Sequence, residues 1–113
     1  MEQENLVPNL VLEMRRGTVV LVVLASLSEP MYGYNLVEHL SGTGVAVEAN
    51  TLYPLLRRLE SQELLTSSWN TDGAKPRKYY TLTDRGRQVL AELTQHWHAI
   101  TASLEQILEE QPR

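Results

Sequence analysis

The chain has 113 residues, 42% hydrophobic and 21% charged, which is typical of one folded domain and too short for a two-domain enzyme. Cysteine is absent, which excludes a disulfide scaffold, a thiolate nucleophile and a cysteine-ligated metal site. The formal net charge is −4, but residues 57–87 carry 7 basic and 4 acidic side chains, so a basic segment lies between two acidic ends.

The sequence has no feature of a membrane or exported protein. Its apolar runs fall short of the roughly 18 residues needed to cross a bilayer. The first residues are acidic, whereas a signal peptide begins with basic ones. We therefore expect a cytoplasmic protein with no membrane partner.

The first half of the chain predicts short helices. Apolar residues at helical spacing indicate a helix from near Pro8 to Arg16, with a frayed arm as the alternative. The run 17–27 is apolar on every side, and its length favours a buried helix although its valines favour a strand. Residues 34–40 have the spacing of a short amphipathic helix, and residues 45–47 suggest a short strand.

The clearest helix of this half is expected over residues 50–63. Its apolar stripe is formed by Leu52, Leu55, Leu56 and Leu59. Polar and basic residues make up the opposite stripe and its flanks: Asn50, Pro54, Arg57 and Ser61, with Thr51, Tyr53 and Arg58 beside them. Pro54 is expected in the first turn, where its missing N–H has no partner.

A hairpin and a long helix follow. Residues 65–70 and 77–82 are rich in Thr, Trp and Tyr and enclose a turn-forming loop, which predicts two paired strands. Thr83 or Asp84 can cap the last helix. Its apolar residues step alternately by 3 and 4, a spacing typical of a two-helix seam: Leu90, Leu93, Trp97, Ile100, Leu104 and Ile107.

This order of elements predicts a mainly α fold with a β-hairpin wing. Residues 1–83 would form a winged helix-turn-helix domain with an N-terminal helical arm, 1–16, and residues 84–113 a C-terminal dimerisation helix. The polar stripe of the helix over residues 50–63 suits a DNA major groove, and the basic residues of the hairpin suit the phosphate backbone. We therefore expect double-stranded DNA as the partner.

Three ordered blocks make the expectation more specific: Tyr32-Gly33-Tyr34, residues 51–60 (TLYPLLRRLE) and residues 76–83 (PRKYYTLT). Together they resemble the signature blocks of PadR-type transcriptional regulators over nearly the whole chain. The resemblance implies a homodimeric repressor, not an enzyme, that binds a pseudo-palindromic operator and is released by a small effector. One departure is Glu48 before the second block, because a carboxylate at a helix N-terminus competes with phosphate.

The candidate site residues form two groups. The candidate DNA contacts are Tyr32, Asn50, Thr51, Tyr53, Pro54, Arg57, Lys75, Arg77 and Lys78. The candidate dimer and effector residues are Leu90, Leu93, Trp97, Ile100, Leu104 and Ile107. The resemblance implies that an aromatic at the position of Trp97 lines a pocket for a planar hydrophobic compound, and simple packing of the seam is the alternative.

No catalytic residue, metal ligand set or cofactor is expected, because the sequence carries none of the corresponding motifs. Two other functions stay open at this point. A winged-helix module that binds a protein and not DNA would agree with the acidic total and with Glu48. A DNA-binding protein without an effector would use the same recognition helix and wing.

Overall fold

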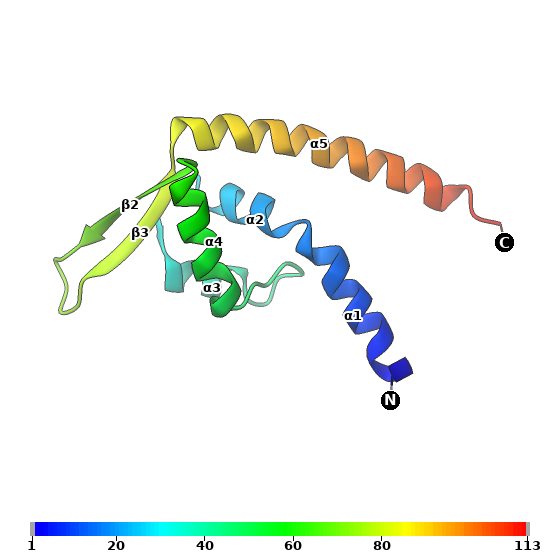
Figure 1. Ribbon diagram of the computed structural model, residues 1–113, viewed down its shortest axis with the longest axis horizontal. Helices are drawn as coiled ribbons and strands as arrows, with labels where there is room; N and C mark the ends of the chain where they lie inside the picture. Colours follow the sequence, from blue (N-terminus) through cyan, green and yellow to red (C-terminus); the bar gives the residue numbers. More distant parts are fainter. Residues whose placement is uncertain (1, 113) are drawn as a thin grey trace.

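The computed structural model describes residues 2–112 and has five helices and three strands in that part of the chain (Figure 1). Their bounds, in chain order, are α1 Glu2–Arg16, α2 Val19–Ser26, β1 Met31–Tyr32, α3 Gly33–Leu40, α4 Ala49–Ser61, β2 Leu65–Asn70, β3 Arg77–Leu82 and α5 Asp84–Glu109. Residues 1 and 113, the outer limits of the two predicted domains, lie outside the described residues.

The sheet has the strand order β1-β3-β2, and both pairs are antiparallel. Strands β2 and β3 form the predicted hairpin with Leu65 opposite Leu82 and Asn70 opposite Arg77, so the predicted strand limits are confirmed. Helices with a hairpin wing make this a winged-helix fold, as the sequence predicted.

The core lies between α2, α3, α4 and the base of the hairpin. The predicted stripe of α4 is fully within it, because Leu52, Leu55, Leu56 and Leu59 are at most 8% exposed. The other buried apolar residues come from α2, α3, the connecting loops and the sheet: Val23, Leu24, Leu27, Leu36, Leu40, Val47, Leu64, Leu65, Tyr80 and Leu82. This cluster fixes the position of the opposite, polar face of α4.

Three expectations were wrong in detail. Helix α1 begins at Glu2, so Pro8 lies inside it and not near its start. Residues 45–47 form no strand. The strand that joins the hairpin in the sheet is β1, whose two residues pair with the open edge of β3. Because α4 begins at Ala49, Pro54 lies in its second turn, where its missing N–H leaves the carbonyl of Asn50 without that helical hydrogen bond.

Hydrogen bonds fix the connection from α4 into the hairpin and the connection from the hairpin into α5. Helix α4 ends with Glu63 in the left-handed region (φ 64°) and a bond from the Leu64 N–H to the Leu59 carbonyl (3.0 Å), which is a Schellman ending. Thr83 caps α5, since its Oγ1 accepts a hydrogen bond from the Gly86 N–H at 2.9 Å.

The seam stripe of α5 divides into two parts. Leu90 and Leu93 are half-buried and pack against the core of the same chain, where α5 lies against α2. The remaining four residues of the stripe, Trp97, Ile100, Leu104 and Ile107, are 39–54% exposed. For Leu90 and Leu93, the neighbouring helix is therefore α2 of their own chain.

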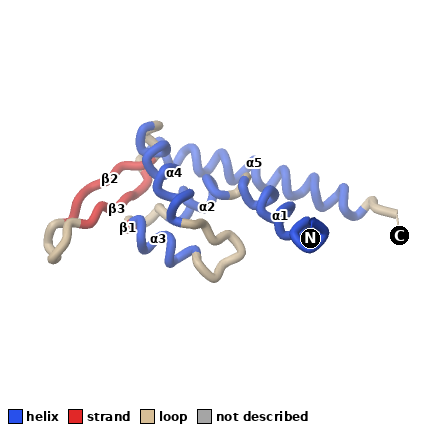
Figure 2. Tube along the Cα trace, turned by 60° about the horizontal axis from the view of Figure 1, so that its bottom comes forward, coloured by secondary structure: helices blue, strands red, loops and turns tan. Residues whose placement is uncertain are grey.

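The molecule is elongated, with extents of 60 × 38 × 21 Å. Helix α1 and the C-terminal half of α5 extend from one end, and the hairpin projects from the other (Figures 1 and 2). Among the described residues, no helix combines the length and apolar character required to cross a membrane.

Candidate nucleic-acid interface

The outer face of α4 is solvent-exposed and polar. Asn50, Thr51, Pro54 and Arg57 are all exposed, as the periodicity predicted. Glu48 is the N-cap residue that precedes Ala49, and its exposed side chain makes no capping hydrogen bond to the backbone N–H groups. The first turn of α4 therefore presents both free N–H groups and a carboxylate to solvent.

The wing is held against α4 by one carboxylate. Lys78 Nζ on β3 lies 3.5 Å from Glu60 Oε1 on α4. The Ser67 hydroxyl on β2 donates a hydrogen bond to the other oxygen of Glu60. Both strands of the hairpin are thus linked to the same residue of α4.

The wing is also linked to the segment before α3. The Asn70 side-chain amide donates to the Tyr32 hydroxyl at 2.9 Å, and the Arg77 guanidinium lies 5.3 Å from the centre of the Tyr32 ring. Tyr79 meets that ring edge to face, with the ring centres 5.6 Å apart. Tyr32 therefore supports the wing while its hydroxyl keeps a proton to donate.

Helices α3 and α4 come close together beside the wing. A Cβ added at Gly33 would lie 2.5 Å from Cε1 of Tyr53, so glycine lets the ring lie against α3 and a larger residue would displace it. This contact explains the glycine of the Tyr32-Gly33-Tyr34 block. Tyr53 is 36% exposed, and its ring forms part of the surface between α4 and the hairpin.

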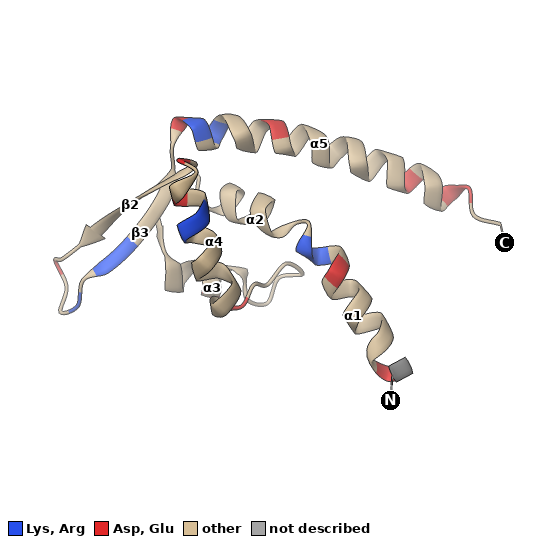
Figure 3. Cartoon of the chain, viewed as in Figure 1, with Lys and Arg blue, Asp and Glu red and all other residues tan. Residues whose placement is uncertain are grey.

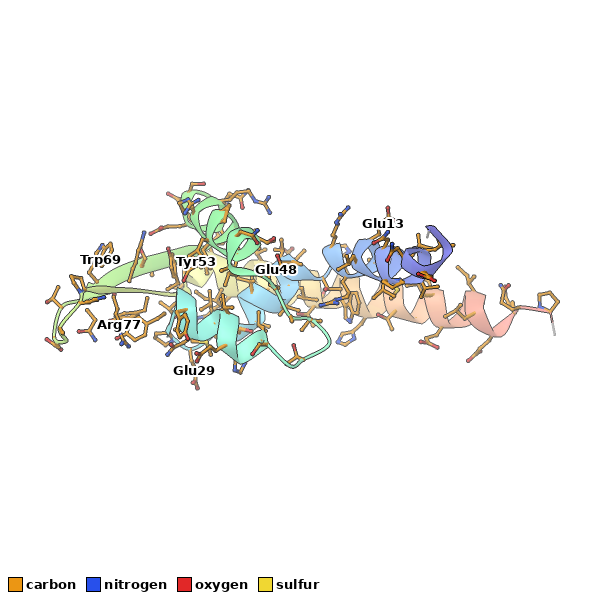
Figure 4. All side chains as sticks on the ribbon, turned by 90° about the horizontal axis from the view of Figure 1, so that it is seen from below. Glu13, Glu29, Glu48, Tyr53, Trp69 and Arg77 are labelled. Atoms are coloured by element: carbon orange, nitrogen blue, oxygen red, sulfur yellow. The ribbon has the colours of Figure 1, made fainter. Side chains whose placement is uncertain are left out.

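A hollow of about 900 Å³ lies between α3, α4 and the wing. Figure 4 labels Trp69 and Arg77 on the hairpin and Tyr53 on α4. Of the described residues that line the hollow, four are basic and none is acidic: Tyr32, Gly33, Tyr34, Asn35, Tyr53, Arg57, Trp69, Lys75, Arg77, Lys78 and Tyr80. The positions of Lys and Arg on β3, in the wing loop and on α4 are coloured blue on the cartoon in Figure 3.

The hollow brings together six of the nine predicted DNA-contact residues: Tyr32, Tyr53, Arg57, Lys75, Arg77 and Lys78. The other three, Asn50, Thr51 and Pro54, lie on the exposed face of α4 outside it. Trp69 also lines the hollow, and the sequence analysis did not predict it. A tryptophan in a predicted strand of the wing could have indicated a contact residue.

One acidic residue modifies the edge of the hollow. A hydrogen bond from the Tyr34 hydroxyl to the Glu38 carboxylate, together with the charge of Glu38, raises the pKa of Tyr34. Elsewhere in residues 2–112, no group of three His, Cys, Asp or Glu side chains is placed to hold a metal ion.

A winged-helix fold with a basic hollow beside its recognition helix defines a class of proteins that are transcriptional regulators in many cases. The comparisons identify the family within this class. The profile of the transcriptional regulator PadR-like family matches residues 20–92. The chain therefore belongs to the PadR-like family of transcriptional regulators, which are not enzymes.

Individual relatives agree with this assignment. A PadR family transcriptional regulator from Eggerthella lenta is 51% identical, with a TM-score of 0.92 over 98% of this chain and 99% of that one. A transcriptional regulator of Mycobacterium tuberculosis is 36% identical over 71% of this chain and 76% of its own length. Bacillus subtilis PadR, solved in complex with operator DNA, shares the fold with 24% identity and a TM-score of 0.63, covering 68% of this chain and 45% of that one.

Proposed function

We propose that this protein regulates transcription by binding double-stranded DNA, with α4 in the major groove and the hairpin on the neighbouring backbone. The observation that carries the proposal is the all-basic charge of the hollow between α4 and the wing, next to an exposed polar stripe on α4. Bacillus subtilis PadR, which shares the fold, binds operator DNA. The protein would act in the cytoplasm, in contact with the genome.

The local charge supports DNA binding in spite of the acidic total. Each cation that neutralises a phosphate releases condensed counterions, so affinity depends on the cations at the contact surface. Of the four basic residues of the hollow, Lys78 is paired with Glu60, whereas Arg57, Lys75 and Arg77 are exposed and form no ion pair with another described residue. Arg77 packs on the Tyr32 ring, which holds its guanidinium in place. Arg57 and Lys75 have neither kind of partner among the described residues, so we expect them to contribute most to phosphate binding.

The test is a salt series of binding to the promoter DNA upstream of the protein's own gene. We expect the double variant Arg57→Ala, Lys75→Ala to bind more weakly, with the log–log salt slope reduced by about 1.8, or about 0.9 for each phosphate contact. The matched control is Arg85→Ala, Arg87→Ala, which removes the same charge at the start of α5. It should stay close to wild type because these arginines lie outside the hollow.

Equal weakening by both double variants would mean that only net charge matters, which contradicts the proposed interface. A different outcome is that the wild type binds neither this promoter nor any fragment from a genome-wide DNA selection, even at low salt. That result would favour the alternative, a winged-helix module that binds a protein partner. In that case Glu48, exposed at the start of α4, would be the first residue to test for protein binding.

We propose further that the protein is a homodimer formed by α5, the helix of the predicted dimerisation segment 84–113, together with α1. The four exposed residues of the α5 stripe are apolar, and α1 exposes Leu6, Val7, Leu10, Val11 and Met14 on one face. Exposed apolar helix faces of this kind are typical of a protein interface. The dimer would place two α4 helices about 34 Å apart, the distance between successive major grooves, on a pseudo-palindromic operator.

A planar hydrophobic effector is the third part of the proposal. Trp97 is 39% exposed on the apolar face of α5, where the two copies of a symmetric dimer would bring their indoles near each other. A compound bound there would release DNA, and so relieve repression, only if it favours the DNA-incompetent dimer. A panel of planar aromatic compounds tests this step. A compound that quenches the fluorescence of Trp97 should also weaken operator binding and raise the expression of a promoter reporter.

A further inference from the structure

Trp69 is the most exposed aromatic side chain of the wing, with 64% of its surface accessible. It lies on β2 directly opposite Lys78. The hydrogen bonds and ion pairs that hold the wing to the rest of the fold do not involve it. An indole is flat and apolar with a single N–H donor, and it is frequent where a protein surface meets a partner.

The position of Trp69 follows from the alternation of side chains along β2. Leu65, Ser67 and Trp69 lie on the same face, because successive side chains of a strand point to opposite sides. Leu65 is buried in the core and Ser67 is bonded to Glu60 on α4. Trp69 is the next residue outward on this face, and its side chain lines the hollow instead of packing against the helix.

The surroundings of the indole combine two kinds of chemistry. Lys75, Lys78 and Arg57 provide positive charge, and Tyr34 and Tyr53 provide further aromatic surface. A partner that matches this lining carries negative charge and apolar surface at close spacing. The backbone of DNA has this character, because anionic phosphates alternate with deoxyribose rings.

We propose that Trp69 packs against a deoxyribose of the bound DNA strand while Arg57 and Lys75 reach the flanking phosphates. This inference rests on the proposed DNA-binding function and adds an uncharged contact to it. A sugar contact involves no base edge and releases no counterion. Its contribution to affinity should therefore be the same on operator and on random DNA, and independent of salt.

The experiment measures the affinity of Trp69→Ala for a mixed-sequence duplex of about three helical turns and for the promoter duplex, each over a salt series. We expect affinity to fall about tenfold on both duplexes, as when one aromatic stacking surface is removed, with an unchanged salt slope. Trp69→Phe should recover most of the loss because it keeps a flat ring. Ser68→Ala, an exposed neighbour on the opposite face of β2, is the matched control and should bind as wild type.

A second measurement does not depend on the alanine variant. In Trp97→Phe, Trp69 is the remaining tryptophan, and binding of the duplex should change its emission. Wild-type affinity of Trp69→Ala, or unchanged emission when Trp97→Phe is saturated with duplex, would overturn this inference and leave the proposed function intact. Absence of any salt-dependent DNA binding by the wild type would overturn both.

Discussion

Lys78 on the wing and Glu60 on the recognition helix form an ion pair with 3.5 Å between Nζ and Oε1, and both side chains are 32% exposed. Lys78 also lies 5.3 Å from the centre of the Tyr80 ring. The sequence placed Lys78 among the DNA contacts because it belongs to a cluster of wing cations. The pairing indicates a second task, which is to set the angle between hairpin and helix.

Replacing Glu60 by Gln should separate these two tasks. The amide can still accept the Ser67 hydrogen bond, but it no longer neutralises Lys78. We expect the free energy of unfolding to fall by less than about 1 kcal/mol, because the pair is partly solvated. DNA affinity at low salt should rise, with a salt slope steeper by up to about 0.9. Denaturant titration and a binding series measure the two effects.

Glu63→Gln is the control for this charge change. Glu63 pairs with Arg85 at 3.7 Å, but these side chains are 80% and 65% exposed and lie outside the hollow. Its removal should leave the salt slope of DNA binding unchanged. A steeper slope in both variants would indicate a general charge effect and would contradict the particular role of Glu60.

Glu63→Gly should stabilise the protein. Glu63 has a φ of 64° at the end of α4, a conformation that strains a residue with a Cβ and suits glycine. We expect a gain of about 0.5–1 kcal/mol, which raises Tm by about 4 °C. Glu63→Ala removes the same charge and keeps the Cβ, so thermal unfolding of this variant should show no gain. A rise of equal size in both variants would assign the effect to charge.

Gly86→Ala should be strongly destabilising. A Cβ at this position would overlap the carbonyl oxygen of Leu64, which is backbone held by a hydrogen bond from the Thr83 N–H at 3.1 Å. We expect a loss of about 2–3 kcal/mol in a chemical denaturation curve. Gly44→Ala is the comparison, because a Cβ there meets no described atom within 4 Å. A neutral Gly86→Ala would show that α5 can shift away from β2.

The double substitution Ile100→Asp, Leu104→Asp should convert the proposed dimer to a monomer. Both residues are more than half exposed on the apolar face of α5, so two carboxylates there cost little in the isolated chain but much at a helix interface. Sedimentation velocity should show half the wild-type mass, with an unchanged circular dichroism spectrum. Gln106→Asp, on another face of the same helix, should stay dimeric. A wild type that sediments as a monomer would refute the proposal directly.

Much of the fold was determined by local sequence. The hairpin limits at residues 65–70 and 77–82 follow from strand-forming residues around a turn-forming loop. The buried stripe of α4 follows from the 3.6-residue period, which also fixes which polar residues are exposed. The sequence narrows the cap of α5 to Thr83 or Asp84, both with side-chain oxygens that accept a backbone N–H, and the structure has Thr83. These features depend on neighbours within a few residues, so the sequence contains them.

The tertiary structure decided what depends on distant partners. Strand β1 has only two residues and no period, and it exists because β3 offers an unpaired edge to Met31 and Tyr32. The pairing of Lys78 with Glu60, the packing of Leu90 and Leu93 on the core of their own chain, and the place of Trp69 over a basic hollow all join segments far apart in sequence. Residue types and spacings record which groups are available, but only the packed chain brings such groups within contact distance.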